Sequence, residues 1–475
     1  MQPGSFDPST PGAGPISGAA GSPDTVSLQA LTISLPPVEE KAALPAGFRA
    51  GAATAGIKPS GRADLAIIAT LREPAAAAAV FTRNQVVAAP IRLSRAHLNA
   101  TEIGGGGRFG WADAVVATAG SANAATGVQG DADQAEICKA VAAALQTRPE
   151  RTLAISTGVI GVRLPVEKVC AAIAQLGPHL ASTGAGLTAV ARAMMTTDTK
   201  IKLATTSVEL PGSDGEPVRV TVSGIAKGVG MIHPRMATML SVVLTDAAAA
   251  PDTLYGLLAP IVQRTWNQLS VDGDTSTNDT VFLLASGASG ARPAATASPE
   301  AAVLGAAVEA VARSLARQQA ADGEGASTLI TCQVSGAADD YDARAVARSV
   351  ISSSLLKAAV HGRDPNWGRV ASAAGNARLP DEELLEAAGL HHTEAMPRAG
   401  RGPEFDLDRL RIAIAGTPVF AAGAPLPFDR AAVRKAMDAP EVLIRLDLGL
   451  GKGAGEAFGC DLTEGYVIEN AEYTT

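Results

Sequence analysis

Apolar runs and amphipathic stretches alternate along the chain from Lys41 onward. Apolar runs bounded by turn-forming residues predict buried strands at 65–70 and 114–119. Apolar residues at helical spacing predict three helices in this half of the chain: 137–145, 166–176 (with Pro165 in its first turn) and 185–195. Strands and helices that follow one another in this way indicate a mixed α/β fold.

The second half has the same character. The turn-rich stretch 211–217 predicts a hairpin whose second strand covers 218–223. A glycine-studded loop, 227–237, then leads into an apolar, β-branched strand predicted at 238–245. Further elements are expected in this order: a helix around 254–261 that Pro260 kinks or shortens, helices at 301–319 and 343–360, a surface excursion at 391–403, and a last strand at 441–446.

Residues 1–40 lack this patterning and contain no Lys or Arg. A secretory signal needs a basic start followed by an apolar run, and a mitochondrial presequence needs arginines. The segment is rich in Pro, Gly and Ser, which predicts a disordered tail. No apolar run is long enough to cross a bilayer, so we expect a cytoplasmic protein with no membrane partner.

Composition narrows the class of protein further. Hydrophobic residues make up 47% of the chain and aromatic residues 3%, so Ala, Val, Leu and Ile must fill the core. The net charge is -8 with no basic run, which argues against a nucleic-acid partner. The four cysteines have no metal-ligand or disulfide spacing and are expected to be reduced thiols: Cys138, Cys170, Cys332 and Cys460. No metal site is expected.

Two motifs suggest binding sites that their context does not support. Gly449–Ala454 matches GxGxxA after a predicted strand, but the chain ends without the helix, second strand and acidic residue that a dinucleotide site requires. Asp272–Asp279 resembles a calcium loop but lacks the glycine at its sixth position and the glutamate at its twelfth. We interpret it as a turn whose side chains cap their own backbone.

The segment 227–240 is chemically the most informative. A loop shaped by two glycines and a proline runs directly into a buried strand, and Thr238 opens that strand. A strained peptide before a threonine hydroxyl permits an N-to-O acyl shift, and hydrolysis of the ester would free the α-amine of Thr238. Such an amine has a pKa of about 7.7–8.0 and can act as general base for its own hydroxyl. This suits a chain with six histidines and no GxSxG motif. From periodicity alone, however, an ordinary threonine at a strand start is the favoured interpretation.

This segment resembles the signature of the ornithine acetyltransferase family, the bifunctional glutamate N-acetyltransferases of arginine biosynthesis. Further motifs carry the resemblance, in family order, over roughly 41–475. They are Gly47–Arg49, Ala55–Lys58, Ala79–Asn84, Ala119–Ala124, Ser156–Gly161, Met195–Thr199, Ser270–Asp279, Asp322–Ala326, His361–Arg369, Gly459–Thr463 and Asn470–Thr475.

The resemblance implies an ornithine acetyltransferase/DmpA-like α/β fold of mixed sheets with packed helices. It also implies self-cleavage between Ala237 and Thr238, giving an α chain (41–237, preceded by the tail) and a β chain (238–475) that assemble as two of each. The implied reaction moves an acetyl group from N2-acetyl-L-ornithine to L-glutamate through an acetyl-threonine, without a cofactor. Whether acetyl-CoA also serves as donor is left open.

Site residues follow from the same resemblance. Thr238 matches the nucleophile, and Thr157 and Gly158 match the family's oxyanion pair. Substrate contacts are matched by Thr197 (or its neighbour Thr196), Lys227, Thr238, Glu324, Asn470 and Thr475. Taken without the family, these residues would be read as a capped turn, a surface lysine, a loop acid and a free tail.

Some features depart from the family pattern. The loop 104–107 and the segment 391–403 look like insertions, and Val229 and Arg235 stand where smaller or neutral residues are more usual. Arg235, close to the nucleophile, could alter substrate preference. Two alternatives stay open: an N-terminal-nucleophile aminopeptidase or amidohydrolase of related fold, and an uncleaved ligand-binding relative. Intact Thr238, Lys227 and Glu324 argue against the second.

Overall fold

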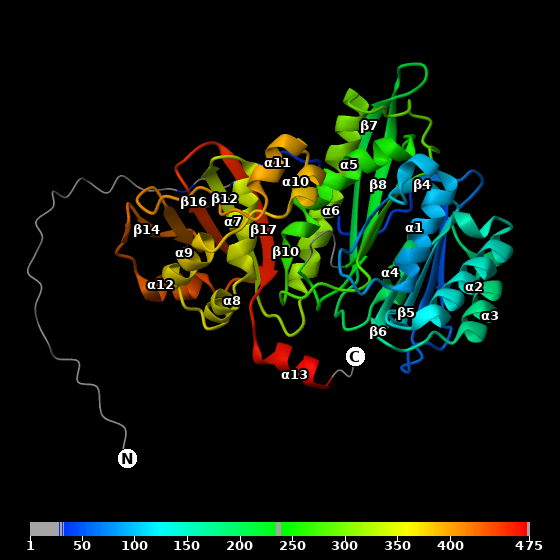
Figure 1. The fold of residues 1–475 in the computed structure, drawn as a ribbon, viewed down its shortest axis with the longest axis horizontal. Helices are drawn as coiled ribbons and strands as arrows, with labels where there is room; N and C mark the ends of the chain where they lie inside the picture. Colours follow the sequence, from blue (N-terminus) through cyan, green and yellow to red (C-terminus); the bar gives the residue numbers. More distant parts are fainter. Residues whose placement is uncertain (1–27, 29–30, 32, 234–238, 473–475) are drawn as a thin grey trace, which may run out of the picture.

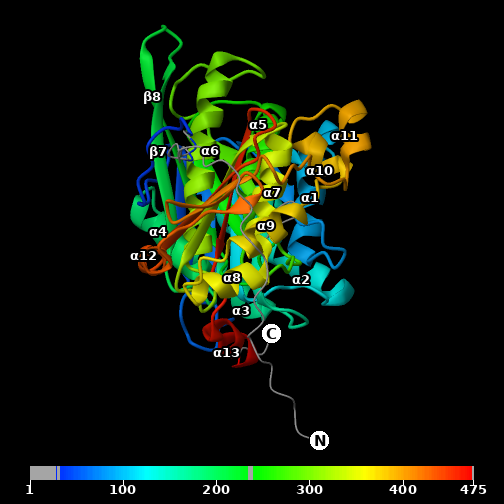
Figure 2. The same cartoon turned by 90° about the vertical axis from the view of Figure 1, so that its left-hand side faces the viewer.

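Three β-sheets and the helices packed on them form the part of the chain that the computed structural model describes, residues 28, 31, 33–233 and 239–472 (Figure 1). A six-stranded and a four-stranded sheet lie together, and a seven-stranded sheet lies beside them. The β7–β8 hairpin extends beyond the other elements, as a quarter turn of the molecule shows (Figure 2).

The six-stranded sheet has the order β4-β3-β11-β9-β8-β7. Its strands are β3 (Ala75–Phe81), β4 (Phe109–Ala112), β7 (Lys202–Pro211), β8 (Pro217–Lys227), β9 (Leu240–Thr245) and β11 (Thr280–Ala285). The central strands β9 and β11 run parallel, and every one of their residues is buried. Such apolar runs need cover on both faces of the sheet. The segment that contains Thr238 therefore leads into the middle of the core.

The four-stranded sheet packs near one face of this central sheet. It consists of β1 (Phe48–Ala53), β2 (Leu65–Thr70), β5 (Ala114–Ser121) and β6 (Thr152–Val159), in that order. Its helices are α1 (Ala89–Thr101), α2 (Gly127–Leu145), α3 (Val166–Leu176) and α4 (Gly184–Met194). Helices α2 and α3 cover its outer face, while α4 packs in the core shared with the six-stranded sheet.

The seven-stranded sheet has the order β10-β17-β12-β16-β13-β14-β15. Its strands are β10 (Leu269–Ser270), β12 (Leu329–Ala337), β13 (Arg411–Ile414), β14 (Thr417–Ala421), β15 (Ala424–Pro425), β16 (Glu441–Asp447) and β17 (Gly453–Cys460). The helices that follow β12 in sequence are α7 (Asp340–Ser352), α8 (Ser354–His361), α9 (Trp367–Gly375), α10 (Glu382–Ala387), α11 (His392–Arg398), α12 (Arg430–Ala436) and α13 (Glu464–Glu472).

Helix α6 (Pro299–Ala321) joins the two halves of the molecule. With α5 (Pro251–Arg264) it covers the other face of the six-stranded sheet, and it also packs on β12 and β17. Ser298 caps its first turn by accepting from the Ala301 N–H at 3.1 Å. Arg313 pairs with Glu456 of β17 at 2.8 Å, and Arg317 pairs with Glu441 of β16 at 2.9 Å. Apolar packing and these ion pairs together fix the six-stranded sheet relative to the seven-stranded sheet.

Most of the elements expected from the sequence are present, including the strands β2 and β5, the hairpin and the helices α2, α3, α4 and α6. Pro165 precedes α3 as its N-cap residue, and α5 continues past Pro260 to Arg264. The helix expected at 343–360 is wrong as one element. Ser353 adopts extended backbone and caps α8 through the Leu356 N–H, which divides α7 from α8.

The strand predicted at 441–446 is present as β16, but the expectation that it is the last strand is wrong, because β17 follows it. β17 contains three glycines and lacks β-branched residues, so its sequence gives a weak strand signal; pairing with β12 forms it. The excursion at 391–403 contains the short helix α11. Most of the tail 1–40 lies outside the described residues, while Glu39 bridges to Thr205 at the edge of β7.

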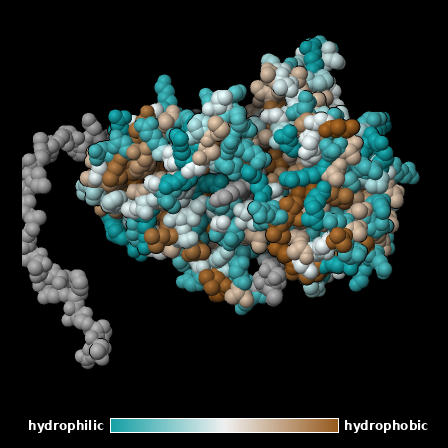
Figure 3. Space-filling model, in the orientation of Figure 1, coloured by the Kyte–Doolittle hydropathy of each residue, from teal (hydrophilic) through white to brown (hydrophobic). Residues whose placement is uncertain are grey.

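The surface is mostly polar on the face in Figure 3, where apolar residues form separate patches. In the described ranges, every helix is too short or too polar to serve as a bilayer span.

Replacing Phe282 with alanine should lower the free energy of unfolding by about 3–5 kcal/mol, because the cavity left in the core cannot close. Phe282 is fully buried in β11, and its ring meets the edge of Phe81 with 5.9 Å between centroids. Urea denaturation followed by circular dichroism measures the loss. Val303→Ala on the exposed side of α6 is the control and should change stability by about 0.5 kcal/mol or less. Equal losses in the two variants would contradict the described core.

Candidate active site

A cavity of about 120 Å³ lies where the ends of β6 and β8 meet the loop before β11 and helix α13. The residues that line this cavity come from segments far apart in the sequence. The described lining residues are Ala122, Thr157, Gly158, Ile160, Thr196, Thr197, Lys227, Gly228, Gly230, Met231, Met239, Leu240, Ser276, Thr277, Asn278, Asp279, Glu324 and Asn470. The structure thus brings together Thr157, Gly158, Thr196, Thr197, Lys227, Glu324 and Asn470 from the sequence-based set.

Ala237, Thr238, Thr475 and Arg235 lie outside the described residues. Their neighbours in the chain are informative nonetheless. Gly230 and Met231 line the cavity before this gap, and Met239 and Leu240 line it afterwards. Met239 is joined to Thr238 by one peptide bond. The cavity wall therefore includes described residues on both sides of this gap, Met231 before it and Met239 after it.

The β5–β6 edge gives the cavity a backbone wall. Gly158 has a φ of +127°, and a Cβ atom there would lie 2.3 Å from the carbonyl carbon of Gly120. Gly120 itself has a φ of +123°, and the parallel pairing of the two strands shifts register next to it. Only glycine tolerates this conformation and this close approach, so position 158 has no room for a side chain.

Lys227, the last residue of β8, places an ammonium group in the cavity wall. Its Nζ donates to the Thr157 hydroxyl at 3.0 Å and to the Thr196 hydroxyl at 2.8 Å. It lies 3.8 Å from Asp198 Oδ2, and 8% of the residue is exposed. Burial lowers the pKa of Lys227, and the nearby carboxylate of Asp198 opposes this shift.

Asp198 connects two buried lysines. It accepts from Lys202 Nζ at 2.7 Å and from the Gly228 N–H at 2.8 Å, and Lys202 also pairs with Asp322 at 2.7 Å. Burial alone would raise the pKa of Asp198, but Lys227 and Lys202 outweigh it and hold the pKa at about 2. This network fixes the turn 196–199 against the end of β8.

Glu324 occupies the opposite side of the cavity. Its Oε1 accepts from the Thr197 hydroxyl at 2.8 Å and its Oε2 accepts from Asn470 Nδ2 on α13 at 3.0 Å. A Cβ atom at position 230 would lie 2.1 Å from Glu324 Oε2, so Gly230 is required for the loop to pass the carboxylate. Thr196 and Thr197 thus divide their roles, since the first contacts Lys227 and the second contacts Glu324.

Two further residues of the cavity were not assigned from the sequence. Asp279 is 1% exposed, its Oδ2 has no hydrogen-bond partner among the described residues, and burial raises its pKa well above the usual range. Asn278 donates to the carbonyls of Ala122 at 2.6 Å and Ser156 at 2.9 Å, which ties this loop to the β5–β6 edge. Both belong to the motif Ser270–Asp279, and its match to the family is the sequence signal that could have identified them.

The loop that resembles a calcium site has a structural role, as interpreted from the sequence. Asp272 Oδ1 accepts from its own loop at the Asp274 N–H, 3.0 Å away, and from the Ile232 N–H at 2.9 Å. Gly449 and Gly451 lie in the connection from β16 to β17, where no helix follows. The second half of the Asp272–Asp279 loop, Ser276–Asp279, lines the cavity, whereas the described lining includes no residue of Gly449–Ala454.

The profile of the ArgJ family matches residues 49–475. The arginine biosynthesis bifunctional protein ArgJ of Thermosynechococcus vestitus is 44% identical over 449 residues, covering 90% of this chain and 96% of that protein. Its counterpart in Thermus thermophilus is 43% identical over 433 residues, covering 91% and 99%.

The chain belongs to the ArgJ family. Among solved structures, ArgJ of Bacillus halodurans is 35% identical with a TM-score of 0.42, covering 49% of this chain and 98% of that chain. Ornithine acetyltransferase of Mycobacterium tuberculosis, complexed with ornithine, is 38% identical with a TM-score of 0.37, covering 42% and 99%. Membership of the ArgJ family confirms the predicted resemblance and an acyltransferase of arginine biosynthesis, and the sheets described above confirm the mixed α/β fold.

Replacing Asp198 with asparagine in this ArgJ protein should lower the free energy of unfolding by about 3–5 kcal/mol at neutral pH, since buried lysines lose their counter-charge. Its folded pKa of about 2 lies below the ordinary 3.8, so the stabilisation is complete above 3.8 and disappears as the pH falls through 2. The difference between wild type and variant should shrink over that interval. Urea denaturation at a series of pH values measures it.

The control for this prediction is Glu136→Gln, which breaks an exposed pair with Lys139. Exposed pairs contribute about 0–1 kcal/mol, so this variant should resemble wild type at every pH. A pH-independent difference for Asp198→Asn would contradict the described charge network.

Proposed function

We propose that this ArgJ protein transfers an acetyl group from N2-acetyl-L-ornithine to L-glutamate, with Thr238 as the nucleophile. The observation that carries the proposal is the cavity itself. It combines a buried ammonium that donates to Thr157 with a carboxylate that accepts from Thr197 and Asn470, and Met239, the residue after Thr238 in the sequence, lines it. Nothing in the reaction requires a metal or redox cofactor.

Activation begins with cleavage of the Ala237–Thr238 bond. The Thr238 hydroxyl oxygen attacks the carbonyl carbon of Ala237, the C–N bond breaks, and the proton passes to the new α-amine. Water then hydrolyses the ester, which leaves a carboxylate on Ala237 and a free amine and hydroxyl on Thr238. The α chain would then comprise residues 1–237 and the β chain residues 238–475.

Acetyl transfer uses the amine that cleavage supplies. The α-amine of Thr238 takes the proton of its own hydroxyl, and the oxygen attacks the acetyl carbonyl of N2-acetylornithine. The C–N bond breaks, and ornithine leaves with the proton on its nitrogen. Glutamate then enters, and its neutral α-nitrogen attacks the carbonyl carbon of the acetyl-threonine ester. The C–O bond to Thr238 breaks, a proton passes from the nitrogen through the α-amine to the Thr238 oxygen, and N-acetylglutamate leaves. One pocket can serve both steps because both substrates carry an α-carboxylate and an α-nitrogen.

Thr157 and Gly158 are suited to hold the negative oxygen that develops at the acetyl carbonyl. Because Lys227 donates to Thr157 Oγ1, the hydroxyl hydrogen of Thr157 is available to donate in turn. Gly158 lies at the same edge, and because it has no side chain a substrate can approach its backbone N–H. Donors of this kind each stabilise the transition state by about 2.7–4 kcal/mol. The cationic Lys227 also favours a neutral amine on Thr238 by repelling its protonated form.

The polar residues opposite this edge suit an amino acid with a cationic side chain. Glu324 holds its carboxylate between Thr197 and Asn470, and each oxygen keeps a lone pair for a further donor. The side-chain ammonium of ornithine matches that charge. Asn470 and Thr475 are near the end of the chain, and Asn470 reaches the cavity from α13.

We further propose that the mature protein assembles as two α and two β chains in the cytoplasm. The four cysteines support a reducing compartment, since all are free thiols and three are buried. Size-exclusion chromatography with light scattering on the cleaved protein tests the assembly.

Replacing Thr238 with alanine should leave one full-length chain without acetyl exchange, whereas the wild type should give two fragments. Intact mass spectrometry detects the cleavage, and conversion of N-acetylornithine and glutamate measures the exchange. Thr238→Ser, which keeps a hydroxyl, should still be cleaved. Acetate release measured alongside separates transfer from hydrolysis. Exchange at the wild-type rate by uncleaved protein would disprove the proposed nucleophile.

Replacing Glu324 with glutamine should raise the KM for N-acetylornithine by about tenfold or more, the effect of losing one charge-assisted contact. The KM for glutamate should not rise, because its side chain carries a carboxylate that Glu324 repels. Steady-state kinetics with each substrate varied gives both constants. Glu394→Gln, on the exposed surface of α11, is the control and should match wild type. An equal rise for both substrates would contradict the assignment.

A further inference from the structure

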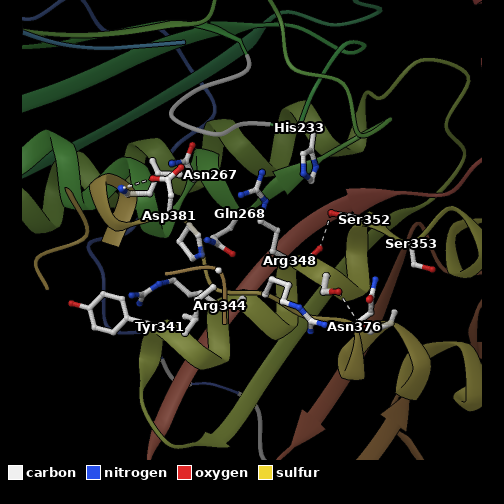
Figure 4. A pocket seen from close by; sticks show the side chains of 18 of the residues that line it. His233, Asn267, Gln268, Tyr341, Arg344, Arg348, Ser352, Ser353, Asn376 and Asp381 are labelled. Carbon is white, nitrogen blue, oxygen red and sulfur yellow. Dashed lines mark hydrogen bonds between the residues drawn. The ribbon is translucent and has the colours of Figure 1, made fainter. Parts of the chain in front are cut away.

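A second cavity, of about 1160 Å³, lies among α7, α9, α10 and the 3-10 turn Trp266–Gln268 (Figure 4). It is about ten times larger than the catalytic cavity. His233 lines it, whereas Gly230 and Met231 line the catalytic cavity, so the same loop borders both. Its volume exceeds the range of about 300–1,000 Å³ usual for small-molecule sites. Acetyl transfer between two amino acids does not account for it.

The charge of this second cavity is strongly unbalanced. Four arginines line it: Arg344, Arg348, Arg369 and Arg378. Asp381 is the single carboxylate among its described lining residues, and both of its oxygens accept from Arg83 at 2.7 Å. Arg344, Arg369 and Arg378 therefore lie in a wall whose single described carboxylate is already paired with Arg83.

Arg344 is the clearest case. It makes no hydrogen bond or ion pair with any residue in the described ranges, and its guanidinium lies 4.9 Å from the centre of the Tyr341 ring. Burial lowers the pKa of Arg344, although nearby Asp340 opposes the shift. A desolvated guanidinium without an anion is costly, and an anionic ligand would remove that cost.

Arg369 and Arg378 leave most of their hydrogen-bonding capacity unused. Arg369 donates to the Leu355 carbonyl at 2.8 Å, and Arg378 donates to the Ala377 carbonyl at 2.7 Å. Each guanidinium has five N–H donors in a planar fork, which matches phosphate oxygens in pairs. Both side chains can therefore bind an anion without breaking an ion pair seen among the described residues.

Gln268 supplies an independent sign of a ligand. It lines the cavity, is 7% exposed, and its buried Oε1 has no hydrogen-bond partner among the described residues. Its Nε2 is already engaged with the Gln263 carbonyl at 3.0 Å. A buried acceptor of this kind calls for a donor such as a hydroxyl or an amino group. A bare inorganic anion would leave it unsatisfied.

We propose that the second cavity binds a small organic molecule that carries two or more phosphate groups, of the size and chemistry of a nucleoside diphosphate. The arginines hold the phosphates in charge-assisted, paired hydrogen bonds. The organic part fills the remaining volume and donates to Gln268. The proposal concerns a site separate from the catalytic cavity and does not depend on the substrates of acetyl transfer.

Isothermal titration calorimetry of the full-length protein tests this site, with ADP, inorganic pyrophosphate and citrate as separate probes. The variants are Arg344→Gln and Arg378→Gln. Arg434→Gln, at an exposed position of α12, is the matched control with the same change in net charge. Thermal unfolding followed by circular dichroism verifies that each variant is folded, and Arg378, which is exposed, provides the test if Arg344→Gln does not fold.

ADP should bind wild type and Arg434→Gln equally, and about tenfold or more weakly to Arg344→Gln and Arg378→Gln. Weaker binding of pyrophosphate than of ADP supports an organic phosphate, and equal binding identifies free phosphate groups as the recognised chemistry. Binding of citrate alone, no binding of either phosphate probe, or an unchanged affinity for ADP in both arginine variants overturns the proposal.

Discussion

The buried ammonium of Lys227 is the constraint on which the catalytic cavity depends. A lysine with 8% exposure must find hydrogen-bond acceptors and a counter-charge, and its own strand provides neither. The acceptors are Thr157 of β6 and Thr196 beyond α4, and the counter-charge is Asp198. The contacts of Lys227 thus bring the end of β8, the end of β6 and the turn 196–199 together. Met239, the residue after Thr238 in the sequence, lines the same cavity.

Close backbone approach makes this convergence possible. Gly158 passes Gly120 at a distance that no side chain permits, and Gly230 passes the carboxylate of Glu324 in the same way. Helix α6 then fixes the second half of the site, because Asp322 and Glu324 follow directly from its end. Strands on one side of the cavity and helix α6 on the other therefore position the polar groups that line it. Such placement is what preorganised electrostatic stabilisation requires.

The two cavities differ in how their charges are balanced. In the smaller cavity Lys227 has the carboxylate of Asp198 nearby, and the carboxylate of Glu324 accepts from the neutral donors of Thr197 and Asn470. In the larger cavity the arginines outnumber the carboxylates, and Asp381 is already paired. A balanced site suits zwitterionic amino acids, whereas an unbalanced one suits an anion. The loop through His233 borders both, so the two sites are neighbours in one structure.

Local sequence patterns were enough to predict the buried strands β2 and β5, the hairpin and the helices α2, α3, α4 and α6. Short motifs were enough to single out Thr157, Lys227 and Glu324, which the fold brings to one cavity. These depend on local periodicity, turn chemistry and short signatures. The tertiary structure alone decided the break at Ser353, the glycine-rich β17, the burial of Asp279 and the arginine-lined cavity. Each of these arises from contacts between segments distant in sequence, such as the pairing of β17 with β12. Burial and charge balance are properties of that packing, which no local pattern encodes.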